Sequence, residues 1–168
     1  MGQFNAKIMA EFNPPRKWIL GRDLSYTTSD LTVEEIKALE GVGVKVKRDT
    51  NKTETITVPT GFVTDLASVP RAMWWAIAPF DVARAAIIHD LLYKSIRQYR
   101  WKMKDKEDKQ LIKEAKVASD KVFKLAMEDA DPKITGWKIY SSWKAVDLFG
   151  NSSIVPVSYT HLTLPTKA

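Results

Sequence analysis

The stretch DVARAAIIHDLLY, residues 81–93, decides how this chain folds, because it is almost wholly apolar and yet carries an ionisable pair. Asp81 has the chemistry of a helix N-cap, so the sequence predicts a helix from Val82 to about Ile96. A helix that is apolar nearly all round lies between other elements rather than on a surface. We therefore expect this helix at the centre of the domain.

The residues before this helix predict strands. Extended segments are expected at residues 6–12, 17–26, 44–48 and 54–58. The last two alternate polar and apolar residues around a short polar turn, which predicts a hairpin. Between the second and third segments, Thr32 and Glu35 have capping-box spacing, so a short helix should begin there and end at Gly41.

The residues after the hairpin predict helices at 70–77, 82–96, 106–129 and 134–149. The third of these has an apolar face formed by Ile112, Ala115, Ser119, Val122, Phe123, Ala126 and Met127. In the fourth, Trp137, Tyr140 and Trp143 recur at near-helical spacing, and we interpret them as core residues. Gly150 should end that helix. The predicted class is α+β, with N-terminal antiparallel strands and a hairpin followed by a bundle of about four helices.

The composition is that of a globular protein, with 45% hydrophobic and 27% charged residues in a chain of 168. A chain of this length buries a sufficient core without disulfides, and the sequence has no cysteine. No apolar run reaches the roughly 20 residues of a membrane span, and the N-terminus does not resemble a signal peptide. We therefore expect no transmembrane segment and a cytoplasmic location at synthesis.

The last 14 residues, 155–168 (VPVSYTHLTLPTKA), resemble the translated sequencing-adapter read-through that ends many metagenomic gene models. We expect this tail to be non-native and residues 1–154 to form a single domain. Without the tail, His89 is the only histidine. A two-histidine metal site is then excluded.

The formal net charge of +6 raises the question of nucleic-acid binding. The densest basic run, residues 102–116, is interleaved with four acidic residues, which is typical of a solvated helix face. The sequence has no zinc-finger, P-loop or RNP-like motif. Specific nucleic-acid binding is therefore only a secondary alternative.

His89 and Asp90 are the sharpest chemical feature, because an ionisable pair inside an apolar helix needs partners. On a helix, His89 and Tyr93 share a face, whereas Asp90 points about 100° away. A buried histidine with a carboxylate nearby is a candidate general base. The simpler alternative is a hydrogen-bonded core histidine with Asp90 paired to an arginine, which is the more common outcome for an isolated pair.

Two other places hold candidate site residues. The loop GFVTDLASVPR, residues 61–71, contains the candidates Thr64, Asp65, Ser68 and Arg71. The alternative is structural: Asp65 and Ser68 are equally suited to capping backbone N–H groups. Arg71 is suited to fixing the loop through a contact with a carboxylate. Asp120 lies at the margin of the apolar face of the 106–129 helix, where a charge is usually solvated.

The runs VPTGFVTDLASVPR, AAIIHDLLY and SDKVFKLAM together resemble the bacteriophage and prophage proteins grouped as domain-of-unknown-function family 1353. The resemblance spans about residues 18–150. It implies a phage or prophage origin, phage or host proteins as partners, and a location in the host cytoplasm or in the virion. It implies no activity, so we expect a morphogenesis or lysis accessory protein.

The pattern DVARAAIIHDLLY followed by SDKVFKLAM is also similar to the catalytic helices of the phospholipase A2 superfamily. This resemblance implies a calcium-dependent hydrolase of lipid or other small ester substrates. His89 would be the general base, Asp90 the calcium ligand, and Tyr93 and Asp120 the groups that hold the imidazole. That superfamily also uses a glycine-rich loop as calcium ligand. Residues 72–81 contain no glycine, so Asp65 and the turn at residues 60–61 would have to substitute.

The hydrolase hypothesis predicts that Asp65, His89 and Asp120 converge around one pocket. The accessory-protein hypothesis predicts instead a buried polar network without an open pocket, with Arg71 paired to Asp65 or Asp90 and no effect of divalent metals.

Overall fold

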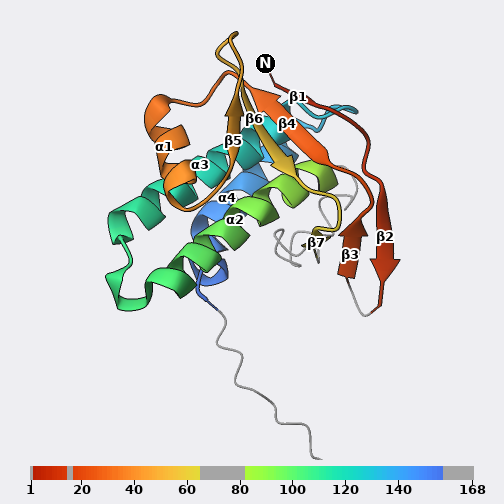
Figure 1. Cartoon of the computed structure of the whole chain (residues 1–168). Helices are drawn as coiled ribbons and strands as arrows, with labels where there is room; N and C mark the ends of the chain where they lie inside the picture. Colours follow the sequence, from red (N-terminus) through yellow and green to blue (C-terminus); the bar gives the residue numbers. More distant parts are fainter. Residues whose placement is uncertain (1, 15–16, 65–81, 157–168) are drawn as a thin grey trace, which may run out of the picture.

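The computed structural model describes residues 2–14, 17–64 and 82–156, and it confirms the predicted α+β class (Figure 1). In chain order, the elements are β1 (Gln3–Phe4), β2 (Ala10–Asn13), β3 (Lys17–Leu20), β4 (Leu24–Thr28), α1 (Val33–Gly41), β5 (Val46–Arg48), β6 (Glu54–Val58), β7 (Val63–Thr64), α2 (Ala83–Met103), the 3-10 helix η2 (Lys104–Lys106), α3 (Lys109–Glu128) and α4 (Gly136–Ser153). The predicted helix at 70–77 lies outside the described residues.

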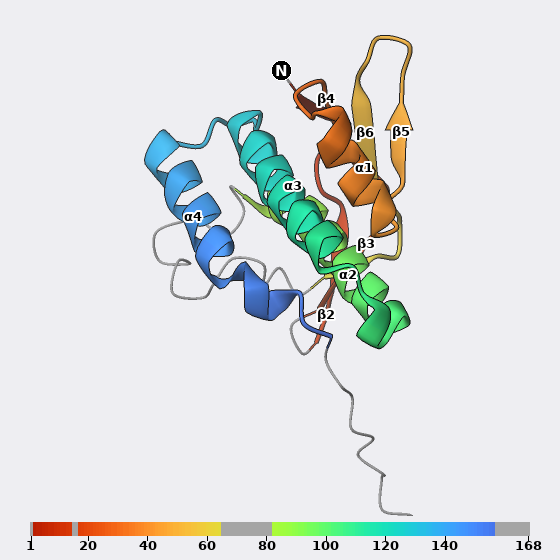
Figure 2. The same ribbon diagram turned by 90° about the vertical axis from the view of Figure 1, so that its left-hand side faces the viewer.

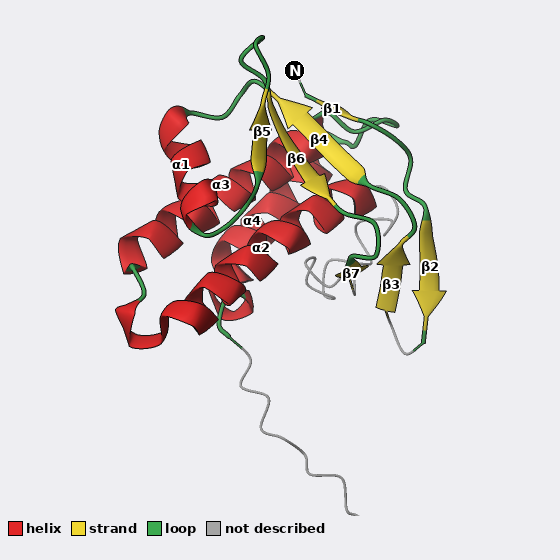
Figure 3. Ribbon diagram, viewed as in Figure 1, coloured by secondary structure: helices red, strands yellow, loops and turns green. Residues whose placement is uncertain are grey.

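The described strands form two antiparallel sheets. The larger has the order β1-β4-β6-β5, and the smaller has the order β2-β3-β7. The predicted hairpin is confirmed, since β5 pairs with β6 and β6 has the predicted bounds. Alternate residues of β4 and β6, including Tyr26 and Ile56, are buried, because one face of the larger sheet packs against α2. Figure 3 shows the helices gathered on that side.

The prediction of one strand over residues 17–26 is wrong. The chain bends at Gly21 and passes from the smaller sheet into the larger one. Asp23 stabilises this bend, because its Oδ1 accepts hydrogen bonds from the backbone N–H of Thr60 at 2.7 Å and from the Thr60 hydroxyl at 2.8 Å. The predicted strand over 6–12 is likewise only partly correct, since the observed strands are β1 and β2.

The capping box of α1 is confirmed. The Thr32 hydroxyl accepts from the backbone N–H of Glu35 at 3.2 Å, and Glu35 Oε2 accepts from the backbone N–H of Thr32 at 2.8 Å. Glu35 also reaches the next layer, because its carboxylate pairs with Lys121 of α3 at 2.7 Å. Figure 2 shows α3 lying between α1 and α4.

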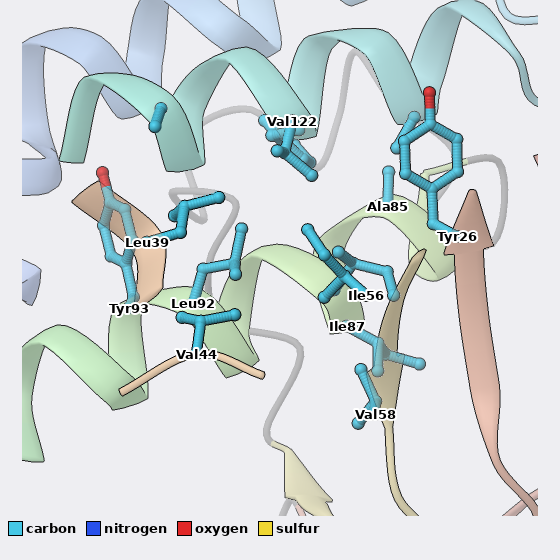
Figure 4. Close-up of a cluster of buried hydrophobic side chains, with 14 of the residues drawn as sticks. Tyr26, Leu39, Val44, Ile56, Val58, Ala85, Ile87, Leu92, Tyr93 and Val122 are labelled. Carbon is cyan, nitrogen blue, oxygen red and sulfur yellow. The ribbon is translucent and has the colours of Figure 1, made fainter. Parts of the chain in front are cut away.

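The central position of α2 is confirmed, because it packs against α3 and against strands β4 and β6. All seven residues of the predicted apolar face of α3 are buried. Figure 4 shows Ala85, Ile87 and Leu92 of α2 in one buried cluster with Val122 of α3 and Ile56 of β6. The core therefore lies between the larger sheet and the α2–α3 pair.

Two helices extend further than the sequence predicts. Helix α2 continues to Met103, because Arg97 and Arg100 in its last turns donate to the backbone carbonyls of Ser153 and Ile154. Helix α4 continues past Gly150, so the prediction that this glycine ends the helix is wrong.

The interpretation of the α4 aromatics as core residues is wrong for two of the three. Trp137 and Tyr140 are 58% and 61% exposed, whereas Trp143 is partly buried against the core. Helical spacing shows that these residues share a face but cannot show whether a partner covers it. Among the described residues, no helix is both long enough and apolar enough to cross a membrane.

Candidate functional site

The side chain of His89 on α2 meets that of Asp120 on α3. The imidazole Nε2 lies 3.0 Å from Asp120 Oδ1, and the Tyr93 hydroxyl donates to the same oxygen at 2.7 Å. The predicted shared face of His89 and Tyr93 is confirmed, with ring centroids 4.0 Å apart. Phe123 of α3 packs against the imidazole at a centroid distance of 4.9 Å. The structure thus brings together the three side chains predicted to form the catalytic group.

Lys116 is a fourth member that the sequence prediction missed. Its Nζ donates to Asp120 Oδ2 at 2.8 Å and to the backbone carbonyl of Asp147 on α4 at 3.3 Å. The prediction of a solvated face for the basic run at residues 102–116 is therefore wrong for Lys116, which is buried. The available signal was its spacing, since residues 116 and 120 lie one helical turn apart on the same face.

The whole group is buried. The exposed fractions are 0% for His89, 3% for Tyr93, 4% for Asp120 and 7% for Lys116. The expectation that Asp120 is solvated is therefore wrong. A carboxylate in an apolar interior is stable only when charged or polar partners satisfy it, and Asp120 has three donors on its two oxygens.

These contacts decide the ionisation state of Asp120. Burial by itself raises the pKa of a carboxyl, but the hydrogen bonds from His89, Lys116 and Tyr93 outweigh it and lower the pKa of Asp120 below its ordinary value. Burial and the neighbouring Asp120 charge raise the pKa of Tyr93. The hydroxyl therefore stays protonated and donates its hydrogen bond to Asp120.

The ionised carboxylate also determines the tautomer of His89. A carboxylate only accepts hydrogen bonds, so Nε2 of the imidazole must carry the proton that points at Asp120. Nδ1 of a neutral imidazole is then a bare lone pair. This atom is buried and has no hydrogen-bond partner among the described residues. A buried acceptor without a donor is uncommon in proteins and marks a place where a ligand or a water can bind.

Asp90 does not join this group. It is half-buried and turned away, with its Oδ1 3.7 Å from Arg97 Nη2, which lies about two turns further along α2. Thr64 is buried on β7, where it pairs with Trp18 of β3. The other predicted loop residues, namely Asp65, Ser68 and Arg71, lie outside the described residues.

A calcium site is not assembled by the residues that the structure describes. Over ranges 2–14, 17–64 and 82–156, no three or more His, Asp or Glu side chains come together in a group that could hold a metal ion. Asp90 has an arginine beside it, and calcium requires six to eight oxygen ligands. Because Asp65 is outside the described residues, the calcium requirement stays a prediction.

No curated protein and no solved structure matches the chain significantly. The family model described as "Protein of unknown function (DUF1353)" matches residues 42–146, more than half of the chain. The matched segment includes all four members of the buried group but ends before Asp147 and Gly150 of α4. The chain belongs to this family of proteins, domain-of-unknown-function family 1353.

Proposed function

We propose that this protein is an ester hydrolase in which His89 is the general base. The observation that carries the proposal is the pair of contacts that the imidazole makes: Nε2 lies 3.0 Å from the Asp120 carboxylate, and Nδ1 is buried without a hydrogen-bond partner among the described residues. A histidine oriented through one nitrogen with the other left as acceptor is the arrangement used for general-base catalysis.

The proposed reaction is the hydrolysis of a carboxylic ester. His89 Nδ1 removes a proton from a water molecule while the water oxygen bonds to the ester carbonyl carbon. The imidazolium that forms is stabilised by Asp120 through Nε2–H. When the tetrahedral intermediate collapses, the bond to the alcohol oxygen breaks and Nδ1–H returns the proton to that oxygen. The products are an acid and an alcohol, and the imidazole is neutral again.

Lys116 and Tyr93 prepare the base without touching the substrate. Lys116 already balances the charge of Asp120 at 2.8 Å, so His89 does not have to be protonated to keep the buried group neutral. A general base must begin the cycle unprotonated. The Tyr93 hydroxyl holds Asp120 Oδ1 in place from the same helix as the imidazole. No step of this mechanism passes through a metal ion.

The test is hydrolysis of p-nitrophenyl acetate, p-nitrophenyl butyrate and vesicles of phosphatidylglycerol, each with calcium and with EDTA. We expect wild type to hydrolyse at least one of them and His89→Gln to lower kcat/KM by about 10²- to 10⁴-fold. The matched control is His161→Gln, which replaces the other histidine of the sequence and should behave as wild type. Activity in EDTA would show that calcium is not required.

Two results would refute the proposal. The first is a folded wild-type protein, judged by circular dichroism, that hydrolyses none of the substrates. The second is a folded His89→Gln variant that keeps the wild-type rate.

The second candidate is a non-catalytic phage morphogenesis or lysis accessory protein. The observation that favours it is the burial of all four polar residues. A buried and satisfied polar network holds α2, α3 and α4 in one arrangement, and this structural role requires no catalysis. This candidate is favoured if wild type is inactive and His89→Gln lowers the melting temperature strongly. No specific observation favours nucleic-acid binding.

A further inference from the structure

Helix α4 approaches the buried group at Gly150, a position that lies beyond the segment matched by the family model. A Cβ atom built on Gly150 would collide with the Tyr93 hydroxyl oxygen. It would also lie 3.1 Å from Tyr93 Cζ and 3.2 Å from Lys116 Cε. The close approach of α4 to Tyr93 and Lys116 therefore depends on residue 150 having no side chain.

The same turn of α4 makes a polar contact with the group. The backbone carbonyl of Asp147 accepts from Lys116 Nζ at 3.3 Å, and this nitrogen also donates to Asp120 Oδ2. Helix α4 is anchored to α2 one turn further on, where Arg97 donates to the Ser153 carbonyl at 2.8 Å. Asp147 and Gly150 thus contact two of the three donors that hold Asp120, namely Lys116 and Tyr93.

We propose that the turn 147–150 of α4 is a positioning element for the His89–Asp120 pair. Gly150 lets the Tyr93 hydroxyl stay on Asp120 Oδ1, and the Asp147 carbonyl keeps Lys116 on Oδ2. Without this turn, Asp120 would lose its orientation, and the proton on His89 Nε2 would lose its fixed acceptor. Neither residue touches the substrate, so both are positioning residues. Residues outside the family match therefore complete the site.

The test compares two glycine substitutions on the same helix. Gly150→Ala adds a methyl group against Tyr93, whereas Gly136→Ala adds one where nothing lies within 4 Å. Both replace glycine by a better helix former, so a simple propensity effect would raise both melting temperatures. We expect Gly136→Ala to melt at or above the wild-type temperature and Gly150→Ala to melt below it.

The specific readout is the imidazole of His89, followed by two-dimensional NMR of protein with ¹⁵N-labelled histidine. In wild type and in Gly136→Ala, we expect Nε2 protonated and Nδ1 unprotonated. In Gly150→Ala, we expect the ring signals to shift or to broaden, because Tyr93 is displaced from Asp120. His161 provides an internal reference within the same spectrum.

A double variant separates positioning from general damage. In a Tyr93→Phe background, the hydroxyl that the new methyl group would meet is absent. Gly150→Ala should then lower the melting temperature by less than it does in wild type. If Gly150→Ala alone does not fold, this double variant must still fold, and its failure to do so would overturn the proposal.

The proposal is also overturned if Gly150→Ala has the melting temperature and the His89 signals of wild type, or if Tyr93→Phe does not reduce the effect of Gly150→Ala. The inference rests on the proposed role of His89 as a base. Melting temperatures and imidazole signals are measured without substrate, however. A protein with no hydrolase activity would refute the proposed function and leave this positioning test to be decided by its own result.

Discussion

The imidazole Nε2 of His89 lies 3.0 Å from Asp120 Oδ1, although the two residues are 31 positions apart and belong to different helices. The contact joins the first half of α2 to the middle of α3 inside the core. Because both side chains are almost fully buried, its effect on stability differs from that of a surface ion pair.

Asp120→Asn should destabilise the protein by about 3–5 kcal/mol, because it leaves the Lys116 ammonium buried without its countercharge. The matched control on the same helix is Glu128→Gln, which breaks an exposed pair with Lys124 at 3.7 Å and should change stability by less than about 1 kcal/mol. Urea denaturation at neutral pH measures both. Equal effects of the two substitutions would contradict the prediction.

The stability of wild type should fall in acid because of Asp120. Its folded-state pKa is lower than the ordinary 3.8, so folding favours the ionised form. The stabilisation is complete above pH 3.8, and it is lost as the pH falls from there through the lower folded-state pKa. Urea midpoints measured from pH 6 to pH 2 should fall less steeply for Asp120→Asn than for wild type. Parallel curves for the two proteins would argue against this contribution.

Stability should also fall in strong alkali, through Tyr26 and Tyr93. Burial and the nearby carboxylates of Asp129 and Asp120 raise the pKa of each phenol. Folding therefore favours the protonated phenols, and this stabilisation is complete below pH 10 and is lost as the pH rises above it. Unfolding followed by circular dichroism from pH 8 to pH 12 should depend less on pH in Tyr93→Phe. An alkaline transition unchanged in both Tyr26→Phe and Tyr93→Phe would rule out this cause.

Thr32→Ala should destabilise the protein by about 1 kcal/mol, because the backbone N–H of Glu35 loses its acceptor at the start of α1. Ser29→Ala, three residues earlier and exposed, is the control and should stay within about 0.5 kcal/mol of wild type. Thermal melting of the three proteins checks the difference. A loss in Ser29→Ala as large as in Thr32→Ala would mean that the cap is not the cause.

Local patterns in the sequence were sufficient to predict several elements. The β5–β6 hairpin follows from alternating residues around a polar turn, and the start of α1 follows from the spacing of Thr32 and Glu35. The burial of α2 follows from its apolar composition, and the buried face of α3 follows from its periodicity. These features depend on residues a few positions apart, so the amino-acid sequence alone determines them.

Tertiary structure decided the rest, because it depends on distances between residues far apart in the chain. The sequence indicated His89, Tyr93 and Asp120 as candidates. Only the packing of α2 on α3 placed three hydrogen-bond donors around the Asp120 carboxylate, and one of these donors is the buried Lys116. Gly150 had the sequence signature of a helix end. It lies inside α4 instead, where the Tyr93 hydroxyl occupies the space that a side chain at this position would need. A charge is buried only where another element supplies its partners, and no local pattern specifies that element.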